Sequence, residues 1–115
     1  YRVHGREPAE AAALLADAQA VAAAGAFAIV LEGIPAELSK RITDEIQIPT
    51  IGIGAGPHCS GQVQVINDIL GLFETFIPRH AKQYTNLAEA ARTAIRAYCS
   101  EVSTRQFPSE EHCFT

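Results

Sequence analysis

The sequence predicts a parallel α/β fold, and three observations lead to this prediction. Amphipathic segments with a 3.6-residue repeat alternate along the chain with short apolar runs. The apolar runs lack the polar–apolar alternation of half-exposed strands, which is typical of strands buried on both faces of a parallel sheet. Helices and strands that alternate in this order build parallel sheets. One fold built from such alternating elements is the eight-stranded parallel β/α barrel. A complete barrel needs roughly 250 residues, so the chain would supply less than half of one.

The first helix is predicted over residues 8–24. Pro8 suits a first helical turn, Gly25 suits the C-terminal cap, and the many alanines between them favour a helix. A continuous apolar run over residues 27–31 follows, and it ends directly at Glu32. We expect this run to be a strand.

A second helix is predicted after Pro35, because Leu38, Ile42 and Ile46 recur at every fourth position. Residues 49–56 are the next strand candidate. They contain three glycines in five positions, which weakens a strand unless the backbone passes close to a ligand or a packed element.

A third strand is predicted over residues 62–66, after a loop over residues 57–61. Parallel strands need a crossover connection, and a loop of about five residues is short for one, which is a difficulty for an all-parallel sheet. In residues 69–85 a short helix is expected to begin at Ile69, and Pro78 interrupts the segment.

The last helix is predicted over residues 86–103, followed by a tail over residues 104–115. Asn86 and Glu89 have the spacing of an N-cap and a capping box. The apolar stripe of this helix would pack on its own barrel or on another subunit, and consists of Leu87, Ala91, Ile95, Tyr98 and Val102.

Composition excludes several classes of function. The net charge of −4 and the scattered basic residues argue against nucleic acid as a partner. No apolar stretch is long enough for a membrane helix, and we expect no signal peptide. Three widely spaced cysteines without a CxxC pair suit the cytoplasm. The absence of methionine, including at the start, suggests a piece of a longer protein.

Glu32 is the first candidate for a catalytic group. In a parallel barrel the catalytic side chains lie at the carboxyl ends of strands, and an apolar surrounding there would make a carboxylate a competent base. The alternative is a loop carboxylate that stabilises the N-terminus of the next helix. Position alone leaves both interpretations open.

The remaining candidates have structural explanations of at least equal weight. Asp68 could bind substrate, but a cap for the turn at residue 69 is favoured. The glycine-rich run over residues 52–56 could approach a ligand or could serve close packing, and it lacks the nucleotide-binding spacings. His80 could meet an anion, although a surface histidine is the simpler interpretation. No role is expected for Cys59.

Five stretches in the same order resemble signatures of the ketopantoate (3-methyl-2-oxobutanoate) hydroxymethyltransferase family. They are YRVHGR at residues 1–6, VLEGIP at 30–35, IGIGAG at 51–56, GQ at 61–62 with ND at 67–68, and PSEEH at 108–112. The resemblance covers nearly the whole chain. It implies that residues 1–115 are the C-terminal portion of a single parallel (β/α)8 TIM barrel domain with a C-terminal helix.

The resemblance also implies an activity, its cofactors and its partners. A hydroxymethyl group would pass from 5,10-methylenetetrahydrofolate to 3-methyl-2-oxobutanoate through an enolate stabilised by Mg2+. The family's catalytic carboxylate falls on Glu32, and its apolar substrate-binding positions fall on Ile53 and Val65. The family's metal ligands have no match here and are expected in the N-terminal half, so the chain alone should be inactive. A homo-oligomer is implied as well.

Two other functions remain open at the level of sequence. One is another magnesium-dependent barrel acting on 2-oxo acids, similar to phosphoenolpyruvate mutase and isocitrate lyase, which would not depend on folate. The other is a non-catalytic barrel fragment that acts as an assembly subunit. In that case replacing Glu32 would leave the activity of the complex intact.

Overall fold

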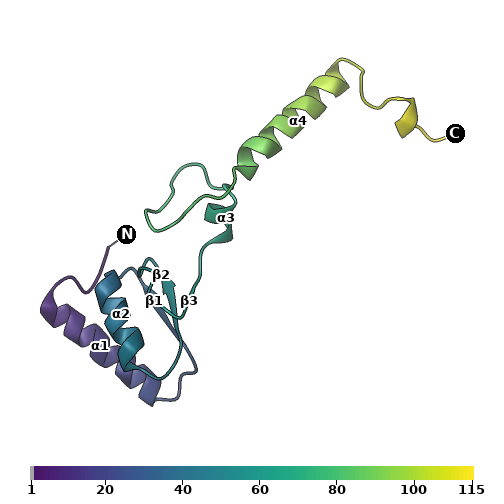
Figure 1. The fold of residues 1–115 in the computed structure, drawn as a ribbon. Coiled ribbons are helices and arrows are strands. Elements are labelled where there is room, and N and C mark those ends of the chain that lie inside the picture. The colour runs from purple at the N-terminus through teal and green to yellow at the C-terminus, as the bar shows by residue number, and fades with distance from the viewer. Residues whose placement is uncertain (1) are drawn as a thin grey trace. The chain divides into compact units, whose positions relative to one another are not determined.

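The computed structural model describes residues 2–115, which form two compact units. The first unit contains the chain up to Val65 together with Pro78–Ala81, and the second contains Ile66–Ile77 and Lys82–Thr115. The elements of the first unit are α1 (Pro8–Ala23), β1 (Ile29–Glu32), α2 (Ala36–Glu45), β2 (Thr50–Ile53) and β3 (Gly61–Gln62) (Figure 1). The predicted order of helix, strand, helix, strand, strand is confirmed.

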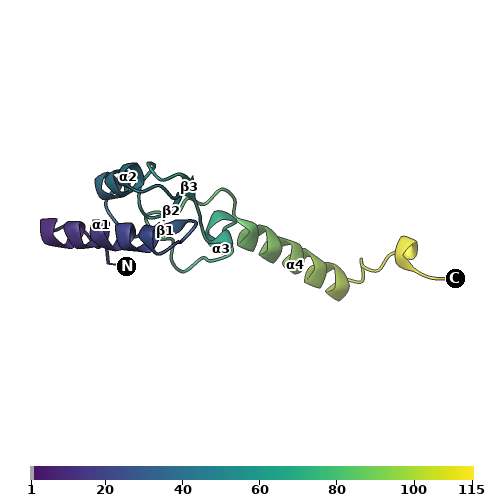
Figure 2. The ribbon, with the colours of Figure 1, turned by 90° about the horizontal axis from the view of Figure 1, so that it is seen from below.

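The three strands form a parallel sheet in the order β1-β2-β3. β1 begins two residues later than predicted and includes Glu32 itself. α1 and α2 lie beside this sheet (Figures 1 and 2). The predicted parallel α/β architecture is therefore confirmed for this part of the chain.

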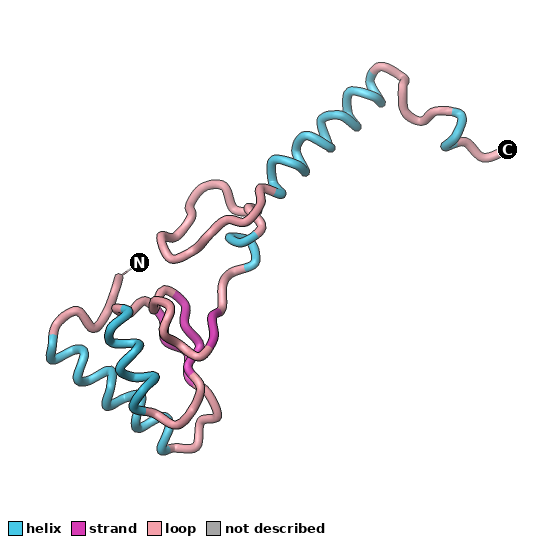
Figure 3. Tube along the Cα trace, viewed as in Figure 1, coloured by secondary structure: helices cyan, strands magenta, loops and turns pink. Residues whose placement is uncertain are grey.

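β3 is shorter than predicted, because only Gly61–Gln62 pairs with β2 and the chain enters a helix at Ile66. Gly61 pairs with Ile51, so the connection after Ile53 returns by only two ladder positions, about 7 Å at the rise of a strand. The seven residues from 54 to 60 cover that distance as a loop without a helix (Figure 3). This small return removes the difficulty of the short connection.

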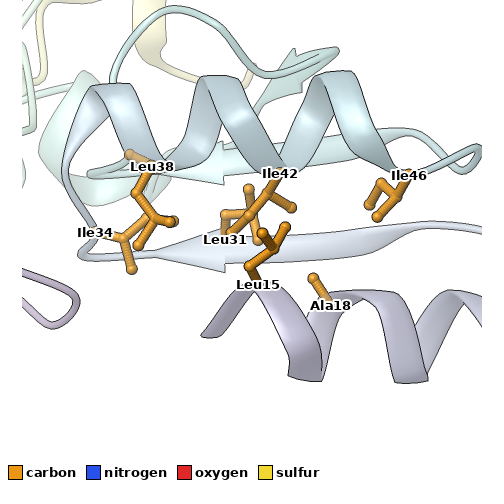
Figure 4. Close-up of a cluster of buried hydrophobic side chains, with 8 residues drawn as sticks. Leu15, Ala18, Leu31, Ile34, Leu38, Ile42 and Ile46 are labelled. Atoms are coloured by element: carbon orange, nitrogen blue, oxygen red, sulfur yellow. The ribbon is translucent and has the colours of Figure 1, made fainter. Parts of the chain in front are cut away.

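The core of the first unit lies between the two helices and β1 (Figure 4). Leu31 is buried in a cluster with the side chains of both helices, so α1 and α2 cover the same face of the sheet. Burial of each such aliphatic side chain stabilises the fold by about 1.5–3 kcal/mol. The buried members of the cluster are Leu15, Ala18, Leu31, Ile34, Leu38, Ile42, Ile46 and Ala55.

A hydroxyl network ties α2 to the start of β2. Thr43 donates to the Ser39 carbonyl at 2.7 Å, so the Thr50 hydroxyl donates to Thr43 Oγ1 at 2.8 Å. Thr50 Oγ1 also accepts the Ser60 backbone N–H at 3.1 Å. Thr50 is 0% exposed, and a buried hydroxyl needs such partners because an unpaired one costs stability. The Ser39 hydroxyl donates to the carbonyl of Ala55 and thereby fixes the returning loop.

The opposite face of the sheet is open within residues 2–115. In the parallel register Val30 pairs with Ile51, and Glu32 pairs with Ile53, so these four side chains share one face. Val30 is 58% exposed. The prediction of strands buried on both faces is therefore wrong for this length of chain, since the described residues supply a cover for one face only.

The second unit contains α3 (Ile66–Ile69), α4 (Leu87–Ser103) and a 3-10 turn (Glu110–His112). Asn86 caps α4 as predicted, because its side chain accepts the Glu89 N–H at 3.0 Å. The predicted helix start at Ile69 is wrong, since α3 ends there. α4 has no buried residue within the described chain, and its apolar stripe is exposed.

Candidate active site at the carboxyl ends of the strands

Glu32 is the last residue of β1, as the strand-end interpretation requires. The following backbone is fixed on both sides, because Gly33 N–H donates to the Ile53 carbonyl at 3.0 Å and the Gly33 carbonyl accepts His4 N–H at 2.9 Å. The side chain of Glu32 is exposed in this chain. The expected apolar surrounding is therefore not supplied by residues 2–115.

Ile53 lies directly beside Glu32 in the parallel register. Both residues end their strands, and paired residues in neighbouring parallel strands direct their side chains to the same face. Strands in a sheet are about 4.8 Å apart, which places an apolar side chain next to the carboxylate. A carboxylate beside one apolar side chain can remove a proton from a carbon acid whose aliphatic substituent contacts that side chain.

Val65 follows β3 and lies outside the strand that was predicted to carry it. It is 44% exposed and is the last residue of the first unit before α3. Its neighbour Gln64 donates from Nε2 to the backbone carbonyl of His80 at 3.1 Å. Gln64 therefore connects the segment after β3 to the returning segment Pro78–Ala81.

His80 is not the surface histidine that the sequence favoured. Both ring nitrogens are buried. Its ring lies against Gly54, where a Cβ would be 3.2 Å from His80 Cδ2. Sequence reasoning missed this contact because no local pattern shows that residue 80 returns to the end of β2.

The glycine-rich run serves close packing at all three of its glycines. A Cβ on Gly52 would lie 3.0 Å from Cys59 Sγ, and one on Gly56 would lie 2.4 Å from Ala36 Cβ. The third glycine, Gly54, is the one that touches His80. The packing interpretation thus holds at Gly52, Gly54 and Gly56, and Cys59 has a packing role where none was expected.

Asp68 does not cap a turn at residue 69, because it lies inside α3. It is 5% exposed and belongs to the second unit. The favoured cap is therefore wrong, and a substrate contact is the alternative that the sequence left open.

The His, Cys, Asp and Glu side chains determine whether residues 2–115 could hold the expected Mg2+. No three His, Cys, Asp or Glu side chains of residues 2–115 gather in a way that could hold a metal ion. Mg2+ is usually bound through one or two carboxylates together with waters and substrate oxygens, and Glu32 supplies a single carboxylate at the end of β1. The described residues offer no cluster of side chains that would complete such a site around it. Within the same residues, no helix is both long enough and apolar enough to cross a membrane.

Comparison with known proteins identifies the family. The model of the ketopantoate hydroxymethyltransferase family matches residues 1–110. The chain belongs to this family. The resemblance carried by the five sequence stretches is thereby confirmed, and the family match covers nearly the whole chain.

Individual relatives agree with the family match. The chain is 59% identical over 114 residues to 3-methyl-2-oxobutanoate hydroxymethyltransferase of Geotalea uraniireducens, covering 99% of this chain and 43% of the relative. It is 60% identical over 111 residues to the enzyme of that name from Chloroflexus aurantiacus, covering 96% of this chain and 40% of the relative. The chain therefore spans about two fifths of the length of these curated relatives.

Proposed function

We propose that this chain forms part of the active site of a hydroxymethyltransferase of pantothenate synthesis. The substrate would be 3-methyl-2-oxobutanoate, the one-carbon donor 5,10-methylenetetrahydrofolate, and the product 2-dehydropantoate. The observation that carries the proposal is the pairing of Glu32 with Ile53 at the carboxyl ends of two neighbouring parallel strands, in a chain of this family.

In the proposed reaction Glu32 acts as the general base. Its carboxylate takes the proton from C3 of the keto acid, and the electron pair of that C–H bond passes into the enolate. C3 then forms a bond to the methylene carbon of the folate, and the bonds of that carbon to N5 and N10 break. Water supplies the hydroxyl oxygen, the C3 proton and the remaining proton of water end on the two nitrogens, and tetrahydrofolate leaves. A positioned general base contributes roughly 10²–10⁴-fold to the rate of such a step.

Ile53 and Val65 are proposed to contact the aliphatic part of the keto acid. Ile53 lies beside Glu32 on the open face of the sheet, so an isopropyl group against it would bring C3 toward the carboxylate. Val65 is accessible in this chain. Such contacts orient the bound substrate, so that its C3–H bond lies in a reactive geometry toward the carboxylate.

The proposal includes a partner, namely the rest of a (β/α)8 barrel. β1 and β3 each pair on one edge only among the described residues, and the face that carries Val30 and Glu32 is open. Unpaired strand edges are normally covered or paired. The ligands for Mg2+ would belong to that partner, because residues 2–115 do not gather them.

The experiment that tests the proposal is deuterium exchange at C3 of 3-methyl-2-oxobutanoate. It uses the full-length protein that contains this chain, with Mg2+ and without folate, and compares Glu32→Gln with the unmodified protein. Exchange should fall by roughly 10²–10⁴-fold in the variant, because the amide cannot accept the proton. Glu37→Gln is the matched control, since Glu37 is an exposed carboxylate in the first turn of α2, and it should leave exchange unchanged.

Three results would contradict parts of the proposal. Exchange that persists in Glu32→Gln would exclude Glu32 as the base and would favour the assembly role. Exchange followed by turnover that needs no folate would favour a barrel enzyme similar to phosphoenolpyruvate mutase. No exchange by the complete protein with Mg2+ would exclude the proposed reaction.

A further inference from the structure

The segment Pro78–Ala81 brings one imidazole ring to the carboxyl end of β2. The segment forms a turn in which Ala81 N–H donates to the Pro78 carbonyl at 3.0 Å. From this turn the His80 ring lies on Gly54, whose φ is +64°. An added Cβ at Gly54 would lie 3.2, 3.3 and 3.4 Å from Cδ2, Cγ and Cβ of His80, so the ring fills the space that a side chain would take.

The same histidine has a second anchor on the segment after β3. Its backbone carbonyl accepts a hydrogen bond from Gln64 Nε2 at 3.1 Å. The other amide atom, Gln64 Oε1, is buried and has no hydrogen-bond partner among the residues that the structure describes. The bond to His80 is therefore what orients the Gln64 side chain within this chain, since a buried amide is held by the bonds that it makes.

Both anchors are next to residues of the proposed substrate site. Gly54 directly follows Ile53, and Gln64 directly precedes Val65. Ile53 ends β2, and Val65 lies beyond β3; the ladder between the two segments ends before them, where Val63 N–H donates to the Gly52 carbonyl at 3.0 Å. His80 adds a bridge beyond that ladder, with its ring on Gly54 and its carbonyl bonded to Gln64.

We propose that His80 is a positioning residue that holds Ile53 and Val65 in the arrangement that the keto acid requires. The proposal rests on the proposed function, because that function assigns the substrate contact to these two side chains. His80 acts through its ring packing on Gly54 and does not touch the reacting atoms. Loss of the ring should let the end of β2 move, and a displacement of about 1 Å in a substrate-positioning group can cost up to about 100-fold in kcat/KM.

The test uses the full-length protein with 13C-labelled isoleucine and valine methyl groups and needs no catalytic activity for its first readout. His80→Ala removes the ring from Gly54 but keeps the carbonyl that Gln64 bonds, so the methyl signal of Ile53 should shift more than that of Val65, whereas the signal of Ile51, two residues earlier on β2, should stay. In Gln64→Leu, which removes only the second anchor, the signal of Val65 should shift more than that of Ile53. His58→Ala is the matched control, because His58 is exposed in the loop before β3, and it should move neither signal.

The second readout is the KM for 3-methyl-2-oxobutanoate in the C3 exchange assay. His80→Ala should raise this KM about tenfold and change the rate at saturating substrate by less. That combination indicates weaker substrate binding. His80→Phe keeps an aromatic ring on Gly54 and should restore the KM. If His80 served only global stability, its replacement would lower the melting temperature, but it would not raise KM more than it changes the rate at saturating substrate.

The outcomes separate this proposal from the proposed function. Unmoved Ile53 and Val65 signals in both His80→Ala and Gln64→Leu would overturn the bridge, whatever the activity. Shifted signals with an unchanged KM would overturn its role in substrate positioning. An unmodified protein without C3 exchange would exclude the proposed reaction and with it the substrate role, while the methyl signals would still decide whether the bridge exists.

Discussion

Gly56 should be the most sensitive glycine of the first unit, and Gly56→Ala tests the packing of the returning loop on α2. Gly56 has a φ of +76°. A Cβ there would lie 2.4 Å from Ala36 Cβ and 2.9 Å from Ala36 Cα. Neither atom can rotate away, because both are fixed to the start of α2. The loop or the helix must therefore move to accept the methyl group.

Two costs add in this variant. A non-glycine residue in the left-handed region costs roughly 1–2 kcal/mol. Overpacking against a fixed neighbour costs typically about 1–3 kcal/mol. We therefore expect Gly56→Ala to lower the free energy of unfolding by about 2–5 kcal/mol.

The control that isolates the second cost is Gly25→Ala. Gly25 has a φ of +100°, and a Cβ there would meet nothing within 4 Å. Gly25→Ala therefore carries the conformational cost of a left-handed backbone but no steric clash. The two variants should be compared by urea unfolding of the full-length protein at one protein concentration, because assembly changes the apparent stability. The difference between them should be about 1–3 kcal/mol.

Removing the opposing methyl group provides a second check. Ala36→Gly in the Gly56→Ala background should recover part of the difference, although Ala36 Cα stays close. Equal destabilisation by Gly56→Ala and Gly25→Ala would refute the packing argument, because it would show that the loop accepts the methyl group without strain.

Two further predictions concern polar contacts. Thr50→Val should cost about 1–3 kcal/mol in urea unfolding, because it removes the hydroxyl of a fully buried residue that accepts the Ser60 N–H and bonds Thr43, whereas Thr85→Val, at an exposed position, should have little effect. The hydrogen bonds from Arg92 hold the pKa of Glu74 below its ordinary value. A carboxylate with a lowered folded-state pKa stabilises the fold above its unfolded-state pKa, about 4.3, and this contribution is lost as the pH falls through the folded-state value. Glu74→Gln should therefore lower the urea midpoint at pH 7 and have no effect at strongly acidic pH, and added salt should reduce its effect at pH 7. A destabilisation by Glu74→Gln that is equal at both pH values would exclude the ion pair as its cause.

The sequence by itself was sufficient for the helices and for the position of Glu32. α1, α2 and α4 were predicted to within two residues at each end, because a helix is specified by signals within a few residues of one another. Pro8 at the first turn, the spacing of Leu38 and Ile42, and the Asn86 cap are signals of this kind. Glu32 was recognised because an apolar run ends at it. The family was also identified from sequence alone, since its motifs lie in order along the chain.

The tertiary structure decided what depends on residues that are far apart in the sequence. The length of β3 is set by its pairing with Ile51 and Gly52, which no local pattern of residues 62–66 could show. The position of Ile53 beside Glu32 is a matter of register, and register is fixed by packing across the sheet. The burial of His80 depends on the return of its segment to Gly54. Local propensity and periodicity act over a few residues, whereas these contacts form only after the strands have paired and the loop has closed.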